Sequence, residues 1–108
     1  MLVDKKTSFK IKAEHPCLAG HFPGNPIVPG VVILDEITQL ILAQYSGHKV
    51  IGFISVKFLQ PLMAEQEVKV QVGELLETSN ELSKIKFTAS CNNSVIAQGD
   101  AKLEMLCQ

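Results

Sequence analysis

One stretch of the chain, residues 30–45, limits the possible folds more than any other. It reads GVVILDEITQLILAQY and is apolar on nearly every face of a helix, and Ser46 and Gly47 after it supply a stop signal. A helix of this composition must be wrapped by other structure, because its apolar faces are otherwise left in water. The sequence therefore predicts one long buried helix with the rest of the domain packed around it.

The structure that covers this helix is predicted in the second half of the chain. Four successive segments have the composition or alternation of strands: 49–58, 65–76, 82–92 and 95–106. Residues 60–64 and 78–80 are expected to form turns, and Asn92-Asn93 indicates a tight hairpin because asparagine tolerates positive φ. Residues 8–13 alternate in the same way and predict a first strand. The expected fold class is α+β, with an antiparallel sheet around the helix.

Length and composition indicate one ordinary domain that covers residues 1–108, without a linker or repeat. Ten basic and eleven acidic side chains give a net charge of -1, and no basic stripe is present, so nucleic acid is not an expected partner. No apolar stretch is suited to span a bilayer, and no signal peptide opens the chain. We therefore expect a cytoplasmic protein with free thiols at Cys17, Cys91 and Cys107.

A proline-rich loop carries the residues of chemical interest. Residues 15–29 hold four prolines and two glycines, which exclude a helix or a ladder strand. The loop contains His21, leads to Gly30 at the start of the predicted helix, and is followed by Asp35 on the second helical turn. These are the parts that proton transfer beside a carbonyl needs: a base near neutral pH, N–H donors for an oxyanion, and an acid.

Several other assignments of these side chains remain open. His15, Cys17 and His21 lie within seven residues and contain zinc-ligand types, although no further ligand pair has suitable spacing. Glu36 competes with Asp35 for the role of the acid, but lies about 100° further around the helix and is interpreted as a polar-contact or subunit-interface residue. Each of these residues can also have a purely structural role.

The segment HFPGNPIVPGV at 21–31, with Asp35 and Gln39 behind it, resembles the signature of hot-dog-fold 3-hydroxyacyl-[acyl-carrier-protein] dehydratases of fatty acid synthesis. KFLQPL at 57–62 is similar to a later basic, aromatic and proline-containing turn of the same family, so the resemblance extends over most of the chain. The segment NPIVPGVVILDE at 25–36 is particularly similar to the corresponding sequence of the small, ApeI-like dehydratases of aryl polyene pathways.

This resemblance implies a hot-dog fold and a role for each residue of the motif. His21 is the general base that removes the proton from C2 of a thioester-linked acyl chain, and the backbone N–H groups of Gly30 and Val31 receive the charge on the thioester oxygen. Asp35 protonates the departing 3-hydroxyl, which at neutral pH requires burial that raises the pKa of its carboxyl group. Gln39, one turn further on, is expected to hold that carboxyl in place.

The implied reaction converts (3R)-hydroxyacyl-[acyl-carrier-protein] to the trans-2-enoyl thioester without a cofactor. The implied partners are the acyl carrier protein and a second hot-dog subunit, either as a homodimer or as a heterodimer. A hot-dog acyl thioesterase and a non-catalytic partner subunit of a dehydratase are the alternatives, since a fold alone does not determine the chemistry.

Three features depart from the family pattern. Asp35 stands where the common housekeeping dehydratase carries glutamate, and only twenty residues precede His21, fewer than in longer relatives. The sequence Ala64-Glu65-Gln66 replaces the usual proline, glycine and acid of the later turn. We expect this last change to concern strand pairing rather than chemistry.

Overall fold

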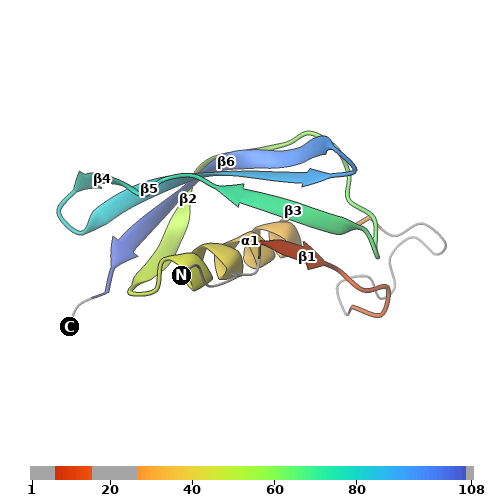
Figure 1. Ribbon diagram of the computed structural model, residues 1–108, viewed down its shortest axis with the longest axis horizontal. Coiled ribbons are helices and arrows are strands. Elements are labelled where there is room, and N and C mark those ends of the chain that lie inside the picture. Colours follow the sequence, from red (N-terminus) through yellow and green to blue (C-terminus); the bar gives the residue numbers. More distant parts are fainter. Residues whose placement is uncertain (1–6, 16–26, 107–108) are drawn as a thin grey trace, which may run out of the picture.

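The structure is a computed structural model that describes residues 7–15 and 27–106. In these residues it contains β1 (Ser8–Lys10), α1 (Gly30–Gln44), β2 (His48–Phe58), β3 (Glu67–Val72), β4 (Leu76–Ser79), β5 (Leu82–Cys91) and β6 (Ser94–Met105) (Figure 1). The strands form one antiparallel sheet in the order β1-β3-β5-β6-β2, and β4 pairs with β5 outside this path. The α+β prediction is confirmed.

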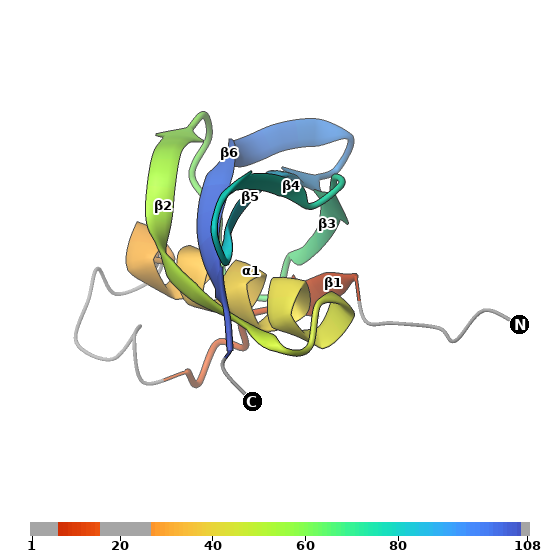
Figure 2. The same cartoon turned by 90° about the vertical axis from the view of Figure 1, so that its left-hand side faces the viewer.

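The sheet curves over α1, so that β2 and β1 lie on opposite sides of the helix (Figure 2). The core lies between the sheet and α1. In β5 the side chains alternate strictly: Ile85, Phe87 and Ala89 are fully buried in this core, whereas Lys84 and Lys86 are exposed. This is the period of a strand with one face on a core and one face in water. The Phe87 ring meets that of Phe53 edge-on, with the ring centroids 5.7 Å apart.

The predicted helix is confirmed in its boundaries but not in its burial. Its buried residues form a single stripe: Ile33, Ile37, Leu40 and Ile41. Val31, on another face, is 74% exposed. The expectation of an entirely wrapped helix is therefore wrong for one chain, because one curved sheet can cover only one side of a helix.

The strand predictions need three corrections. The first strand is shorter than residues 8–13 and ends at Lys10. The segment 65–76 is not one strand, because β3 ends at Val72 and the chain leaves the ladder at Gly73 before β4 begins. The turn expected at 78–80 therefore comes later, where Glu81 adopts a φ of 61°. The last two errors arise because β3 and β4 both pair with β5, and the sequence carries no local signal for the point at which one partner strand replaces the other.

The predicted Asn92-Asn93 hairpin is confirmed. Both residues have positive φ, 52° and 64°, as a two-residue turn between β5 and β6 requires. Cys91, at the end of β5, is a free buried thiol, whereas Cys17 and Cys107 lie outside the described residues. Within ranges 7–15 and 27–106, no helix combines the length and apolarity needed to cross a membrane.

The edge strand β2 is irregular and exposes apolar side chains. Its pairing with β6 shifts between Val50 and Gly52 and again between Phe53 and Ser55, so Ile51 and Ile54 are the extra residues of two bulges. Ile51 is 45% exposed, Ile54 is 56% exposed, and Phe58 at the end of the strand is 48% exposed.

Candidate active site

The helix places Asp35 and Gln39 on the same face, one turn apart. The Gln39 Nε2 donates a long hydrogen bond of 3.4 Å to Asp35 Oδ2. The predicted contact between these two side chains is therefore present. Asp35 is exposed in the single chain, so the burial that the sequence analysis expects around its carboxyl is not supplied by this protomer alone.

Asp35 opens onto a cavity of about 500 Å³ between α1 and β2, which we call the Asp35 cavity. Its lining residues are His15, Val31, Val32, Leu34, Asp35, Glu36, Thr38 and Phe53. Aliphatic and aromatic carbon makes up much of the wall, and the few polar groups lie among it. Pockets of this composition suit an apolar ligand that carries a small number of polar atoms.

Glu36 lines the same cavity as Asp35 and is half-buried. Its position 100° further around the helix therefore does not remove it from the site. Either carboxyl can reach a group bound in the Asp35 cavity, and the choice between them as the acid stays a prediction.

The first two backbone N–H groups of α1 have no backbone acceptor among the residues that the structure describes. Pro29 is the N-cap residue in an extended conformation, and no side chain caps the helix. Its carbonyl accepts the N–H groups of Val32 at 3.0 Å and Ile33 at 3.3 Å, but no described backbone carbonyl accepts those of Gly30 and Val31. These two donors lie at the positive end of the helix dipole, where an oxyanion is stabilised.

Gly30 has a packing role that the sequence analysis does not anticipate. A Cβ atom at this position would lie 2.8 Å from Cζ of Phe58, so the aromatic ring occupies the space that the missing side chain leaves. In this structure the absent Cβ accommodates the end of β2.

His21 lies outside the described residues, as does Cys17. The distance from His21 to Asp35 is therefore not described, and the role of His21 and the zinc-site alternative stay predictions. His15 is described, and it lines the Asp35 cavity. From the sequence, His15 was a candidate metal ligand or a structural residue. Its nearness to Asp35 depends on tertiary structure and has no local sequence signal.

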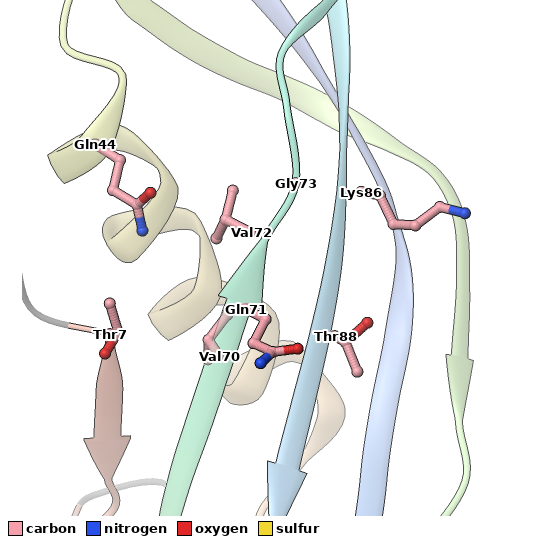
Figure 3. A pocket seen from close by; sticks show the side chains of 8 residues that line it. All are labelled: Thr7, Gln44, Val70, Gln71, Val72, Gly73, Lys86 and Thr88. Carbon is pink, nitrogen blue, oxygen red and sulfur yellow. The ribbon is translucent and has the colours of Figure 1, made fainter.

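A second cavity, of about 600 Å³, lies at the other end of the helix, and we call it the Gln44 cavity (Figure 3). Its lining residues are Thr7, Gln44, Val70, Gln71, Val72, Gly73, Lys86 and Thr88. Neither a carboxyl nor an imidazole group is among these described residues, and the Lys86 amine extends away from the helix. The larger cavity therefore lacks the groups for proton transfer.

Comparison with known proteins gives relatives for nearly the whole chain. The family model ApeI-like, described as ApeI dehydratase, matches residues 4–100. A 3-hydroxyacyl-[acyl-carrier-protein] dehydratase FabZ of Acetivibrio thermocellus is 30% identical over 104 residues, which cover 89% of this chain and 70% of that protein.

Solved structures share the fold. The dehydratase heterocomplex ApeI:P from Xenorhabdus doucetiae superposes with a TM-score of 0.68 at 23% identity, covering 90% of this chain and 83% of that one. A gentisyl-coenzyme A thioesterase superposes with a TM-score of 0.66 at 16% identity, covering 94% and 90%. At these identities the likeness concerns the fold alone, and the predicted hot-dog fold is confirmed.

The family model covers α1, β2 and His15, which together line the Asp35 cavity, and the sequence motif that carries Gly30, Asp35 and Gln39 falls inside the matched range. The sequence resemblance and the fold thus agree with the family match. The chain belongs to the ApeI-like dehydratase family.

Proposed function

We propose that this protein removes water from 3-hydroxyacyl chains carried on acyl carrier protein and releases the trans-2-enoyl thioester, in fatty acid or aryl polyene biosynthesis. The observation that carries the proposal is the Asp35–Gln39 pair at an apolar cavity beside two helix N-terminal donors, in a chain of the ApeI-like family. The apolar wall suits the acyl chain, and the carboxyl group suits its 3-hydroxyl.

The reaction needs a base, an oxyanion site and an acid. In our proposal His21 removes a proton from C2, and the negative charge that develops on the thioester oxygen is stabilised by the N–H groups of Gly30 and Val31. Asp35 donates a proton to the 3-hydroxyl as the C3–O bond breaks, so that water leaves. Gln39 holds the Asp35 carboxyl in the orientation that this transfer needs.

The active form in this proposal is a dimer joined along β2. The strand has an unpaired edge in the described chain and exposes Ile51 and Ile54, which a soluble monomer rarely maintains on a long edge strand. A second hot-dog subunit against this edge would cover Val31 and bring a second surface to the exposed Asp35. A homodimer is the default arrangement, and a heterodimer is the alternative suggested by the ApeI:P heterocomplex.

We further place this activity in the cytoplasm. The free buried thiol of Cys91 is compatible with a reducing compartment.

The test follows the mass of the acyl carrier protein. The purified protein is incubated with a medium-chain (3R)-hydroxyacyl-[acyl-carrier-protein], and intact-protein mass spectrometry monitors the carrier. Loss of one water with the thioester retained is the expected result. Variant His21→Ala is expected to lose the activity, because the base is removed.

Two other outcomes of this assay would contradict dehydration by this protein and would favour the thioesterase or the non-catalytic subunit instead. Free acid and unacylated carrier would indicate a thioesterase, for which Glu36 in the same cavity is the candidate that activates water. No reaction by the protein alone, but reaction when a second hot-dog subunit is added and retained with His21→Ala, would indicate a non-catalytic partner subunit.

A further inference from the structure

We propose that His15 binds the 3-hydroxyl group of the acyl chain and directs it toward Asp35, so that this residue determines the preference for 3-hydroxylated substrates. The inference rests on the proposed function and adds a substrate-binding residue from outside the family motif. Three observations support it: the location of His15, the hydrogen bonds that hold its segment, and the hydrogen-bonding needs of the hydroxyl group.

His15 reaches the Asp35 cavity from a different part of the chain than the other polar groups. Asp35, Glu36 and Thr38 all lie on α1, whereas His15 follows β1 and is half-buried at the cavity wall. Among the described lining residues it is the polar side chain that does not come from the helix. A ligand bound in the cavity can therefore meet polar groups from two separate parts of the chain.

The 3-hydroxyl needs two polar partners during the reaction. Asp35 donates a proton to its oxygen, and the hydroxyl hydrogen itself requires an acceptor when the cavity is closed to water. A neutral imidazole offers one nitrogen that accepts a hydrogen bond. His15 can therefore accept the hydroxyl hydrogen while the Asp35 carboxyl protonates the oxygen, and both bonds persist until water leaves.

The segment that carries His15 is held by an unusual turn. Glu65 has a φ of 67°, a left-handed conformation that is rare for a residue other than glycine. Its N–H donates to the Ile11 carbonyl at 2.8 Å, and its carboxylate accepts the Ala13 N–H at 2.6 Å. The His15 N–H in turn donates to the Lys12 carbonyl at 2.9 Å.

These bonds give the Glu65 side chain a use that glycine, the usual residue of the family's turn, lacks. Backbone strain that persists at one residue is often connected with function, and here the strained residue restrains residues 11–15 just before His15. The replacement of glycine at this turn is expected to concern strand pairing, and the bond from the Glu65 N–H to the Ile11 carbonyl agrees with this; the bond from Ala13 also connects Glu65 to the segment that leads to His15. We assign Glu65 as a positioning residue that acts through His15.

Binding of two inert ligands tests the role of His15. The ligands are a medium-chain 3-hydroxyacyl pantetheine amide and its 3-deoxy analogue, in which the amide prevents thioester cleavage, and calorimetry measures both Kd values. We expect the wild type to prefer the hydroxylated ligand, and His15→Leu to lose about five- to tenfold of this preference while binding the deoxy ligand unchanged. His15→Gln, which retains an acceptor, is expected to keep much of the preference.

An unchanged ratio of the two Kd values in His15→Leu would overturn the inference. This result is distinguishable from failure of the proposed function, since the ratio is measured without turnover. A wild type that releases no water but still discriminates through His15 contradicts the proposed reaction alone.

Variants of Glu65 test the positioning role. Glu65→Ala removes the carboxylate that accepts the Ala13 N–H, and we expect it to lose about threefold of the hydroxyl preference. Glu65→Gln keeps an acceptor oxygen and is expected to retain it. The matched control is Glu67→Ala, because Glu67 also accepts a side-chain hydrogen bond near β1, from Ser8 at 3.2 Å, but does not line the cavity.

Equal losses in Glu65→Ala and Glu67→Ala would mean that the effect is general destabilisation and would overturn the positioning role. If Glu65→Ala does not fold, Glu65→Gly is used, since glycine relieves the backbone strain while still lacking the carboxylate.

Discussion

The two edges of the sheet differ in almost every respect. On one side, β1 has three residues, exposes Lys10 and ties Ser8 to Glu67 by a hydrogen bond. On the other side, β2 has eleven residues and exposes Ile51 and Ile54. Short, charged edges are how soluble proteins avoid pairing with other chains, whereas a long apolar edge invites it. The contrast agrees with the dimer along β2 that we propose above.

The two cavities differ in the groups that they offer. The Asp35 cavity includes Phe53 of β2, two carboxyl groups of α1 and His15 from the segment after β1, whereas the Gln44 cavity includes Thr7 next to β1 and no carboxyl group among its described residues. Beside the Gln44 cavity, the Tyr45 hydroxyl donates a hydrogen bond of 3.2 Å to the Gly73 carbonyl and connects the end of the helix to the sheet. Both candidate carboxyl groups therefore line a cavity that reaches β2.

The largest expected effect is a difference in dehydration rate between a substitution in the Asp35 cavity and one in the Gln44 cavity. Asp35→Asn retains the helix and the contact with Gln39 but cannot deliver a proton, so kcat/KM for dehydration should fall by about 10²- to 10⁴-fold. Gln44→Ala, in the other cavity, is the matched control and should leave the rate unchanged. Steady-state assays of enoyl product measure both, and equal rates in the two variants would contradict the assignment of the site to the β2 side.

The next effect concerns the attachment of β2 to the sheet. Alanine at Gly99 of β6 would place its Cβ against the carbonyl oxygen of Ser55 on β2, and neither backbone can yield easily. We expect Gly99→Ala to lower the free energy of unfolding by about 2–4 kcal/mol in urea titrations.

The control for this change lies on β2 itself. No atom lies within 4 Å of a Cβ added at Gly52, so Gly52→Ala should alter stability by less than about 1 kcal/mol. A Gly99→Ala variant as stable as Gly52→Ala would show that β2 is not held closely against β6.

A smaller effect tests which edge associates. Ile54→Glu introduces a charge on a side chain that is 56% exposed in the single chain, so the fold should be little affected. Covering the exposed half of an isoleucine is worth about 1 kcal/mol, and a symmetric dimer covers two of them, so the dimer Kd should rise by roughly 30-fold. Sedimentation equilibrium measures the Kd, with Lys10→Glu on the β1 edge as the control. Equal weakening by the control would remove the distinction between the edges.

The smallest effect tests the contact between the Phe58 ring of β2 and Gly30 at the start of α1. Gly30→Ala forces the Phe58 ring to move, but the ring is 48% exposed and is free to do so, so stability should change by less than about 1 kcal/mol. Any loss of activity should be restored by adding Phe58→Leu, if the ring rather than substrate occupies this space. A loss that the second substitution does not restore would favour direct contact with substrate.

The predictable parts of the fold are those with a local cause. The helix Gly30–Gln44 follows from its apolar run and its Pro29 and Gly47 boundaries, and the Asn92-Asn93 turn follows from residues that tolerate positive φ. The separate strand Leu76–Ser79 was missed because it depends on where the chain returns to β5. The contact between Asp35 and Gln39 was predictable because helical spacing alone brings them together.

The amino-acid sequence by itself determined the helix, its carboxyl and amide pair, the hairpin and the family, because each depends on spacing along the chain. Only the tertiary structure decided that His15 shares a cavity with Asp35, that Phe58 packs on Gly30, and that one face of the helix stays open. These features depend on how a curved sheet brings distant segments together, and no periodicity within a single segment encodes such contacts.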